Sequence, residues 1–337
     1  MARRNYVESV VDFPLSRQIL VDSGTFICLN GSRPELEDRG GLRMGAVWRS
    51  VFLWIMIFLG GVSTTGCFPT KKLTVASVGV ILEDVARASA KQKDPALVKQ
   101  GMPAYLMLLD GLIEAYPEDR RLLLAGAEAY CSYAGAFTGQ DDPEAAERLY
   151  LKGRGYALRA MPRDQEFVSA LSKPYNALEE YVKNFSRKDV PALFWFASCW
   201  AGWISVTDDS VRALADLPRG VLLMERVIQL DETYNYGGAH LFMGIYKSAK
   251  PRAYGGKPEE ARRHFERAIE ISRGDFLMAY VYYAENYARK TFQKDFFVSL
   301  LEKVLETPAD RVPELTLTNT IAKTRAEELL NHTEDYF

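Results

Sequence analysis

The chain has 337 residues, 48% of them hydrophobic and 26% charged, with a formal net charge of −2. This is the composition of a globular protein with one large or two modest domains, and the near-neutral charge excludes the basic surface typical of nucleic-acid-binding proteins. The three histidines, at positions 240, 264 and 332, are far apart in the sequence and do not predict a metal site.

An apolar segment near the amino terminus has the features of a targeting signal. Residues 51–62 carry no charge, but the segment is too short to span a bilayer, which takes about 20 residues. Basic residues precede it and small residues follow it, as in a secretory signal peptide. We therefore predict a signal peptide at 44–66, with translation from Met44, and interpret 1–43 as a mis-assigned gene start. A disordered cytoplasmic tail before an uncleaved anchor is the alternative.

The residue after this signal is a cysteine. Cys67 directly follows Gly66, so the segment resembles a bacterial lipoprotein signal, although Thr64 stands where leucine is usual. The resemblance implies that Cys67 is lipidated, becomes the first mature residue and provides the only attachment to the membrane. Phe68 follows it, with no aspartate there, which favours the outer membrane.

The rest of the chain, 67–337, is predicted to be one helical domain. Apolar residues recur at helical spacing, and no segment shows the alternation typical of a strand. Asp142 and Pro143 are predicted to start a helix, because aspartate caps helices and proline suits the first helical position. Helices are predicted near 75–90, 96–116, 120–137, 144–161, 189–204, 219–230, 237–246, 258–272, 276–290, 297–304 and 321–330, with one or two shorter ones in 167–184.

A pattern of small and large residues repeats along these helices. In the hairpin 237–274, Ala261, Phe265 and Ala268 follow the spacing 0, +4, +7, with Gly244 on the preceding helix. This arrangement matches a tetratricopeptide (TPR) hairpin, in which small residues let two helices touch and an aromatic ring fills the gap. We therefore predict an all-α fold of stacked antiparallel helical hairpins, a TPR-like α-solenoid. The same spacing occurs at Ala104, Leu108 and Gly111, at Ala146, Tyr150 and Gly153, and at Gly220, Met224 and Val227.

The segment 189–204 is apolar on every face, which predicts a helix buried all round. It carries Trp195, Trp200 and Trp203, which point in different directions on a helix. Core packing is one interpretation of these tryptophans. The alternative is that they line an apolar cavity and bind a ligand.

The loop 247–257 is longer than a standard repeat requires. Arg252 could pair with an acid, and Tyr254, with Tyr246 at the end of the preceding helix, could face the same cavity. These residues complete the predicted ligand-binding set. A rigid surface turn is the alternative interpretation.

Catalytic signatures are missing from the sequence. There is no nucleophile elbow, phosphate-binding loop or Cys/His set with metal spacing, so we predict a protein that is not an enzyme and needs no cofactor or metal. Cys131 and Cys199 fall within predicted helices. Two buried free thiols are expected, because cysteine is commonly buried, while a disulfide between them is the alternative.

Several stretches together resemble one family, the TPR proteins associated with tripartite ATP-independent periplasmic (TRAP) transporters. They cover most of residues 74–337. The resemblance implies a periplasmic lipoprotein that forms a homotrimer, associates with the transporter's extracytoplasmic solute-binding protein, and passes or holds a small apolar or amphipathic acid through a cleft or pore. It brings no catalytic residues. The stretches are 189–195, 200–203, 215–219, 238–244, 254–261 with 264–269, 283–289 and 319–323.

The leading hypothesis is therefore a non-enzymatic ligand-binding and scaffold subunit for a TRAP solute-binding protein. A general periplasmic TPR adaptor for envelope assembly, which grips an extended peptide, is the second hypothesis. An unrecognised hydrolase is the third, and it would require a pocket with perturbed acid–base groups.

Overall fold

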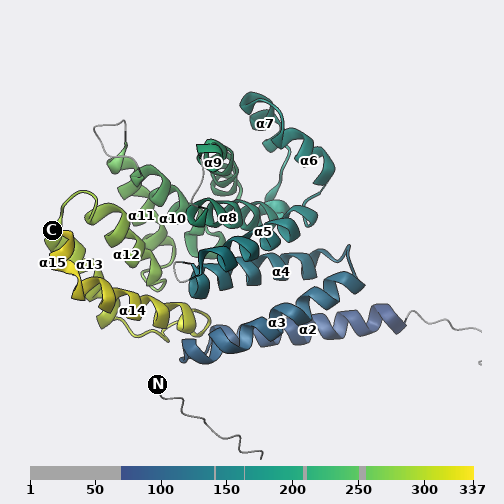
Figure 1. Cartoon of the computed structure of the whole chain (residues 1–337), viewed down its shortest axis with the longest axis horizontal. Coiled ribbons are helices and arrows are strands. Elements are labelled where there is room, and N and C mark those ends of the chain that lie inside the picture. The colour runs from purple at the N-terminus through teal and green to yellow at the C-terminus, as the bar shows by residue number, and fades with distance from the viewer. Residues whose placement is uncertain (1–69, 140–141, 163, 208–210, 250–255) are drawn as a thin grey trace, which may run out of the picture. The chain divides into compact units, whose positions relative to one another are not determined.

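The computed structural model describes residues 70–337 except 140–141, 163, 208–210 and 250–255. All of these residues belong to one compact unit, Pro69–Phe337, in which every regular element is a helix and no strand occurs among the described residues. The fold is therefore all-α, as predicted (Figure 1). None of the helices in the described ranges is both long and apolar enough to cross a bilayer. The predictions for 1–43, for the signal at 44–66 and for Cys67 lie outside the described residues.

Aspartates cap three helices of the first half. Asp94 and Asp119 accept hydrogen bonds from the first backbone N–H groups of α3 and α4, and Asp142 does the same for α5. The predicted helix start at Asp142 and Pro143 is confirmed. The elements are α2 (Thr70–Ala90), α3 (Pro95–Ala115), α4 (Arg120–Tyr133), the π-helical turn η1 (Ala134–Thr138), α5 (Pro143–Arg159), α6 (Asp164–Leu171) and α7 (Tyr175–Val182).

The second half continues with helices joined by short connections. The predicted helix 276–290 is not uniform, because its second part is a π-helical turn in which Arg289 N–H donates to the Ala284 carbonyl over 2.9 Å. The elements are η2 (Arg187–Asp189), α8 (Val190–Val206), α9 (Val211–Asp231), α10 (Tyr234–Ser248), α11 (Pro258–Ile271), α12 (Met278–Tyr283), η4 (Ala284–Ala288), α13 (Lys294–Glu306), η5 (Pro313–Leu315), α14 (Thr316–Asn331) and α15 (Thr333–Tyr336).

Helix α8 is the centre of the larger core. It packs against α5, α9 and α4, and Leu193, Ala197 and Cys199 on it are fully buried. Gly202 lets the ring of Tyr150 from α5 approach so closely that a Cβ there would lie 2.3 Å from the ring. The prediction of a helix buried along its length is confirmed for most of α8, while its last turn is partly exposed.

The small–large pattern is buried at three of the four predicted places. Ala261, Phe265 and Ala268 are fully buried between α11 and its neighbours, and the sets in α5 and α9 are buried as well. The prediction is wrong for α3, where Leu108 is 52% exposed and no atom lies near Gly111. Helix α3 instead buries Leu106, Leu109 and Ile113 against its neighbours.

The two thiols are free. Cys131 and Cys199 are both buried, and the Cys199 thiol donates weakly to the carbonyl oxygen of Ala127 at 3.8 Å. Burial raises the pKa of the Cys199 thiol. The prediction of two buried free thiols is confirmed, and the alternative of a disulfide is wrong.

The end of the chain returns to the first hairpin. Helix α14 contacts both α2 and α3, and it lies beside them in Figure 1. Two ion pairs join the same regions, Lys93 to Asp310 at 2.6 Å and Lys91 to Glu314 at 3.2 Å. The C-terminal helices therefore pack against the N-terminal hairpin of the described chain.

Candidate functional site

A sharp kink near the start of α10 positions the polar residues of one groove. Asn235, Tyr236 and Gly237 all have left-handed backbone angles, which a tyrosine adopts rarely. Asp231 anchors the turn by accepting hydrogen bonds from the backbone N–H and the hydroxyl of Thr233. Two features favour glycine at position 237. Its φ is +77°, and a Cβ there would lie 3.2 Å from the α11 backbone.

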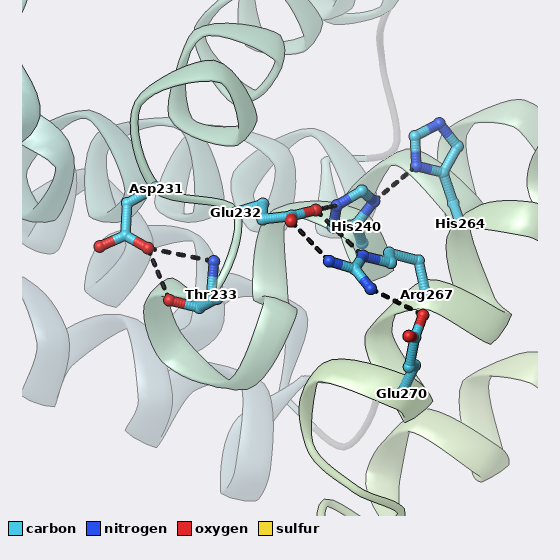
Figure 2. Close-up of polar contacts among 7 residues, drawn as sticks. All are labelled: Asp231, Glu232, Thr233, His240, His264, Arg267 and Glu270. Atoms are coloured by element: carbon cyan, nitrogen blue, oxygen red, sulfur yellow. Dashed lines mark hydrogen bonds and ion pairs between the residues drawn. The ribbon is translucent and has the colours of Figure 1, made fainter.

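A continuous polar chain runs across this groove (Figure 2). The Nδ1 atoms of His240 and His264 lie 2.9 Å apart, and His240 Nε2 lies 3.2 Å from the carboxylate of Glu232. Arg267 donates to both oxygens of Glu232, at 2.5 and 3.0 Å, and to Glu270 at 2.7 Å. These polar contacts connect the end of α9 to α10 and α11.

The two imidazoles are neutral near pH 7. Burial lowers the pKa of His240 against the opposing effect of Glu232, and burial and then the neighbouring His240 lower the pKa of His264 to about 4. Only one proton can lie between the two Nδ1 atoms, because two N–H groups facing each other at 2.9 Å would repel. The pair therefore resists taking up a positive charge.

The groove is open and mixed in charge. Its volume is about 400 Å³, and a smaller hollow of about 270 Å³ with Glu225, Met243 and Lys247 in its wall shares His264 with it. Within the described residues no set of three or more His, Cys, Asp or Glu side chains has the arrangement of a metal site. The groove is lined by Glu232, His240, Glu260, Arg263, His264 and Arg267.

The predicted tryptophans do not form one wall. Trp195 is buried and packs edge-on against Phe194, with ring centroids 5.0 Å apart. Trp200 is buried as well, and its indole N–H has no partner among the described residues. Trp203 is only partly buried and donates its N–H to Glu147 of α5 at 3.0 Å.

An arginine joins two of these tryptophans. The guanidinium of Arg154, on α5, lies 5.5 Å from the ring centre of Trp200 and 5.6 Å from that of Trp203. It forms no hydrogen bond or ion pair within the described part of the chain, and burial lowers its pKa. A partly enclosed guanidinium between two indoles suits a carboxylate with an apolar body.

The other predicted ligand residues lie elsewhere. Tyr246, near the end of α10, is partly buried, and the Nζ of Lys247 lies 6.0 Å from its ring centre. Arg252 and Tyr254 lie outside the described residues. The structure thus brings Trp200 and Trp203 together at Arg154, while Trp195 packs against Phe194 nearer the start of α8.

Sequence reasoning missed the residues that carry most of the polar chemistry. His240 and His264 are 24 positions apart but adjacent in space, which only the pairing of α10 with α11 reveals. Arg154 was missed because an arginine on an amphipathic helix normally points to solvent. A usable signal existed for the histidines: each lies on the helix face that the hairpin pattern brings together.

The sequence matches one family model and one relative of known sequence. Residues 91–337 match the family model described as TRAP transporter T-component. The chain is also 24% identical over 270 residues to an uncharacterized protein of Treponema pallidum (strain Nichols). The alignment covers 75% of this chain and 84% of that protein. Because the family model spans well over half of the sequence, the chain belongs to the TRAP transporter T-component family.

Proposed function

We propose that the protein is a non-enzymatic, extracytoplasmic subunit that binds a small ligand and supports the solute-binding protein of a TRAP transporter. Membership of the T-component family supports the association with such a transporter. The proposed ligand is a small apolar or amphipathic acid. Arg154 between Trp200 and Trp203 is the observation that carries this choice, because it offers a free positive charge on an apolar surface.

The proposed anchor is the lipid on Cys67, which would hold the helical domain at the periplasmic face of a membrane, with the outer membrane favoured. We also propose a TPR-like stacking of the hairpins and a homotrimeric assembly, both of which follow from the resemblance. The pairing of α10 with α11 and of α4 with α5 supports the hairpin arrangement.

Acid binding is tested by calorimetric titration of the full chain with heptanoate, with 1-heptanol as the uncharged probe. Arg154→Met keeps the length of the side chain and removes its charge, and we expect heptanoate to bind about tenfold more weakly, since a charge-assisted pair is lost. Arg148→Gln, on the same helix but 70% exposed, is the matched control and should bind normally. Equal affinity of the Arg154 variant and the wild type would refute the acid site.

The partner is tested separately by co-elution with the solute-binding protein of the same transporter. We expect a complex at tens of micromolar with or without heptanoate. No association under either condition would reject the scaffold role. Capture of an extended peptide from an envelope-assembly protein instead would support the alternative of a general TPR adaptor.

A further inference from the structure

The hydrogen bonds in the groove between α9, α10 and α11 assign the proton of His240. The carboxylate of Glu232, which Arg267 holds in place, can only accept hydrogen bonds. The Nε2 of His240, 3.2 Å from that carboxylate, therefore carries the proton and donates it. Because a neutral imidazole has a single N–H group, the Nδ1 of His240 is an acceptor. Glu232 thus sets the tautomer of His240.

The same reasoning assigns the proton of His264. The two Nδ1 atoms lie 2.9 Å apart and the ring centroids 5.2 Å apart, so the nitrogens face each other across a hydrogen bond. Since His240 Nδ1 is the acceptor, the proton of this bond belongs to His264 Nδ1. The Nε2 of a neutral His264 then has no proton and carries a free lone pair. The series of hydrogen bonds therefore ends in an acceptor.

This acceptor is open to a ligand. His264 is partly exposed, while His240, which holds it, is only 7% exposed. Figure 2 shows the second ring nitrogen of His264 on the side away from His240. It has no hydrogen bond to the residues that the structure describes. His264 lines both the groove of about 400 Å³ and the hollow of about 270 Å³ beside it, so a bound molecule can reach this nitrogen.

Arg263 adds an unpaired positive charge to the same groove. Lys247 and Arg267 pair with glutamates, but Arg263 forms no hydrogen bond or ion pair with any described residue. It directly precedes His264 on α11, and both side chains line the groove. A guanidinium group is well suited to bind a carboxylate. The groove therefore offers a donor for a carboxylate and an acceptor for a neighbouring hydroxyl group.

We propose that this groove binds an organic acid with a hydroxyl group next to its carboxylate, with Arg263 donating to the carboxylate and His264 Nε2 accepting from the hydroxyl. An acid that lacks the hydroxyl leaves the acceptor without a partner and binds more weakly. Ile228 and Met243, in the wall of the adjacent hollow, provide an apolar surface for a short alkyl chain. The site is separate from the proposed acid site at Arg154 of α5.

The first test reads the two tautomers from nitrogen-15 NMR spectra of the imidazoles in the full chain at pH 7.5. We expect the proton on Nδ1 of His264 and on Nε2 of His240. The variants His264→Gln and His240→Gln identify the signals. A His264 that is protonated on Nε2 would overturn the proposal, because that nitrogen would then donate and not accept.

The second test titrates the full chain with 2-hydroxyhexanoate and with hexanoate and follows the NMR signals of His264. We expect 2-hydroxyhexanoate to bind about five- to tenfold more tightly, the gain from one added hydrogen bond. Arg263→Met should weaken the binding of both acids. Arg154→Met should leave this titration unchanged, so the two proposed sites are tested independently. Equal affinities for the two acids, or His264 signals that do not respond, would contradict the proposed site.

Two glutamates that bind Arg267 supply matched variants. Glu232→Gln removes the carboxylate that orients His240, and we expect His264 to lose its preference for protonation on Nδ1 and 2-hydroxyhexanoate to lose its advantage over hexanoate. Glu270→Gln removes the other partner of Arg267, 2.7 Å away, and should keep both properties. If Glu232→Gln retains the full preference for the hydroxylated acid, the hydrogen bonds from Glu232 to His264 do not create the acceptor and the proposal fails.

Discussion

Helices α11 and α3 carry the same small–large spacing and use it in opposite ways. In α11, Ala261, Phe265 and Ala268 are fully buried, and the ring of Phe265 touches Gly244 of α10 and stacks on Tyr283 at 5.0 Å. In α3, the corresponding Leu108 is 52% exposed. The spacing therefore identifies a helix face but does not show that another helix covers it.

The reason for the difference is the rotation of α3 about its axis. On α3, the large residue that packs against a small residue of a neighbouring helix is Ile113. A Cβ placed on Gly126 of α4 would lie only 2.8 Å from the Cδ1 of Ile113. Helix α3 is apolar on more than one side, and Met107 and Leu97 are also exposed, so the sequence alone did not determine which side is buried. The packing against α4 buries one of these sides.

The sharpest test of this comparison replaces the large residue on each helix. Phe265→Ala should lower the free energy of unfolding by about 3 to 5 kcal/mol, because it leaves a cavity at a fully buried position. Leu108→Ala should change it by less than about 0.5 kcal/mol, as expected for an exposed position. Urea denaturation of both variants and of the wild type measures the two losses.

The outcome at Leu108 decides the interpretation of α3. A loss as large as that of Phe265→Ala would mean that another surface covers this face in solution. Met107→Ala, at a residue that is 74% exposed, is a second check on the same face and should also be close to neutral.

A second test uses the glycines. Gly244→Ala would place a Cβ 2.9 Å from the buried ring of Phe265, and such overpacking costs about 1 to 3 kcal/mol. Gly111→Ala on α3 meets no atom within 4 Å, so the gain in helix propensity should stabilise the protein by about 0.5 to 1 kcal/mol. Opposite signs in thermal or urea unfolding are expected. The same sign for both variants would contradict the assignment of the two faces.

These contrasts show what the sequence could predict. The helices, the cap at Asp142 and the buried α8 follow from local periodicity and capping chemistry, which the chain carries within a few residues. The candidate sites depend on contacts between residues far apart in the chain. Arg154 of α5 contacts Trp200 and Trp203 of α8, and no local sequence pattern predicts this contact.

The α10–α11 contact also differs from the exposed face of α3 in its response to acid. His264 has a pKa of about 4 in the folded protein, below the ordinary value of about 6.5, so the unfolded chain binds its proton first. This contribution to stability is complete above pH 6.5 and is lost as the pH falls from about 6.5 to about 4. His240, with a lowered pKa, acts in the same direction.

We therefore expect the urea midpoint to fall between pH 7 and pH 5, and the fall to be smaller in His264→Gln than in the wild type. The effect should be smaller than that of Phe265→Ala, because His264 is only partly buried. His332→Gln changes the exposed histidine that pairs with Asp335 at 2.9 Å, and it should leave the difference between the two pH values as in the wild type. If His264→Gln and His332→Gln behave alike, the histidine pair does not couple the α10–α11 contact to protonation, and the acid response must arise elsewhere in the chain.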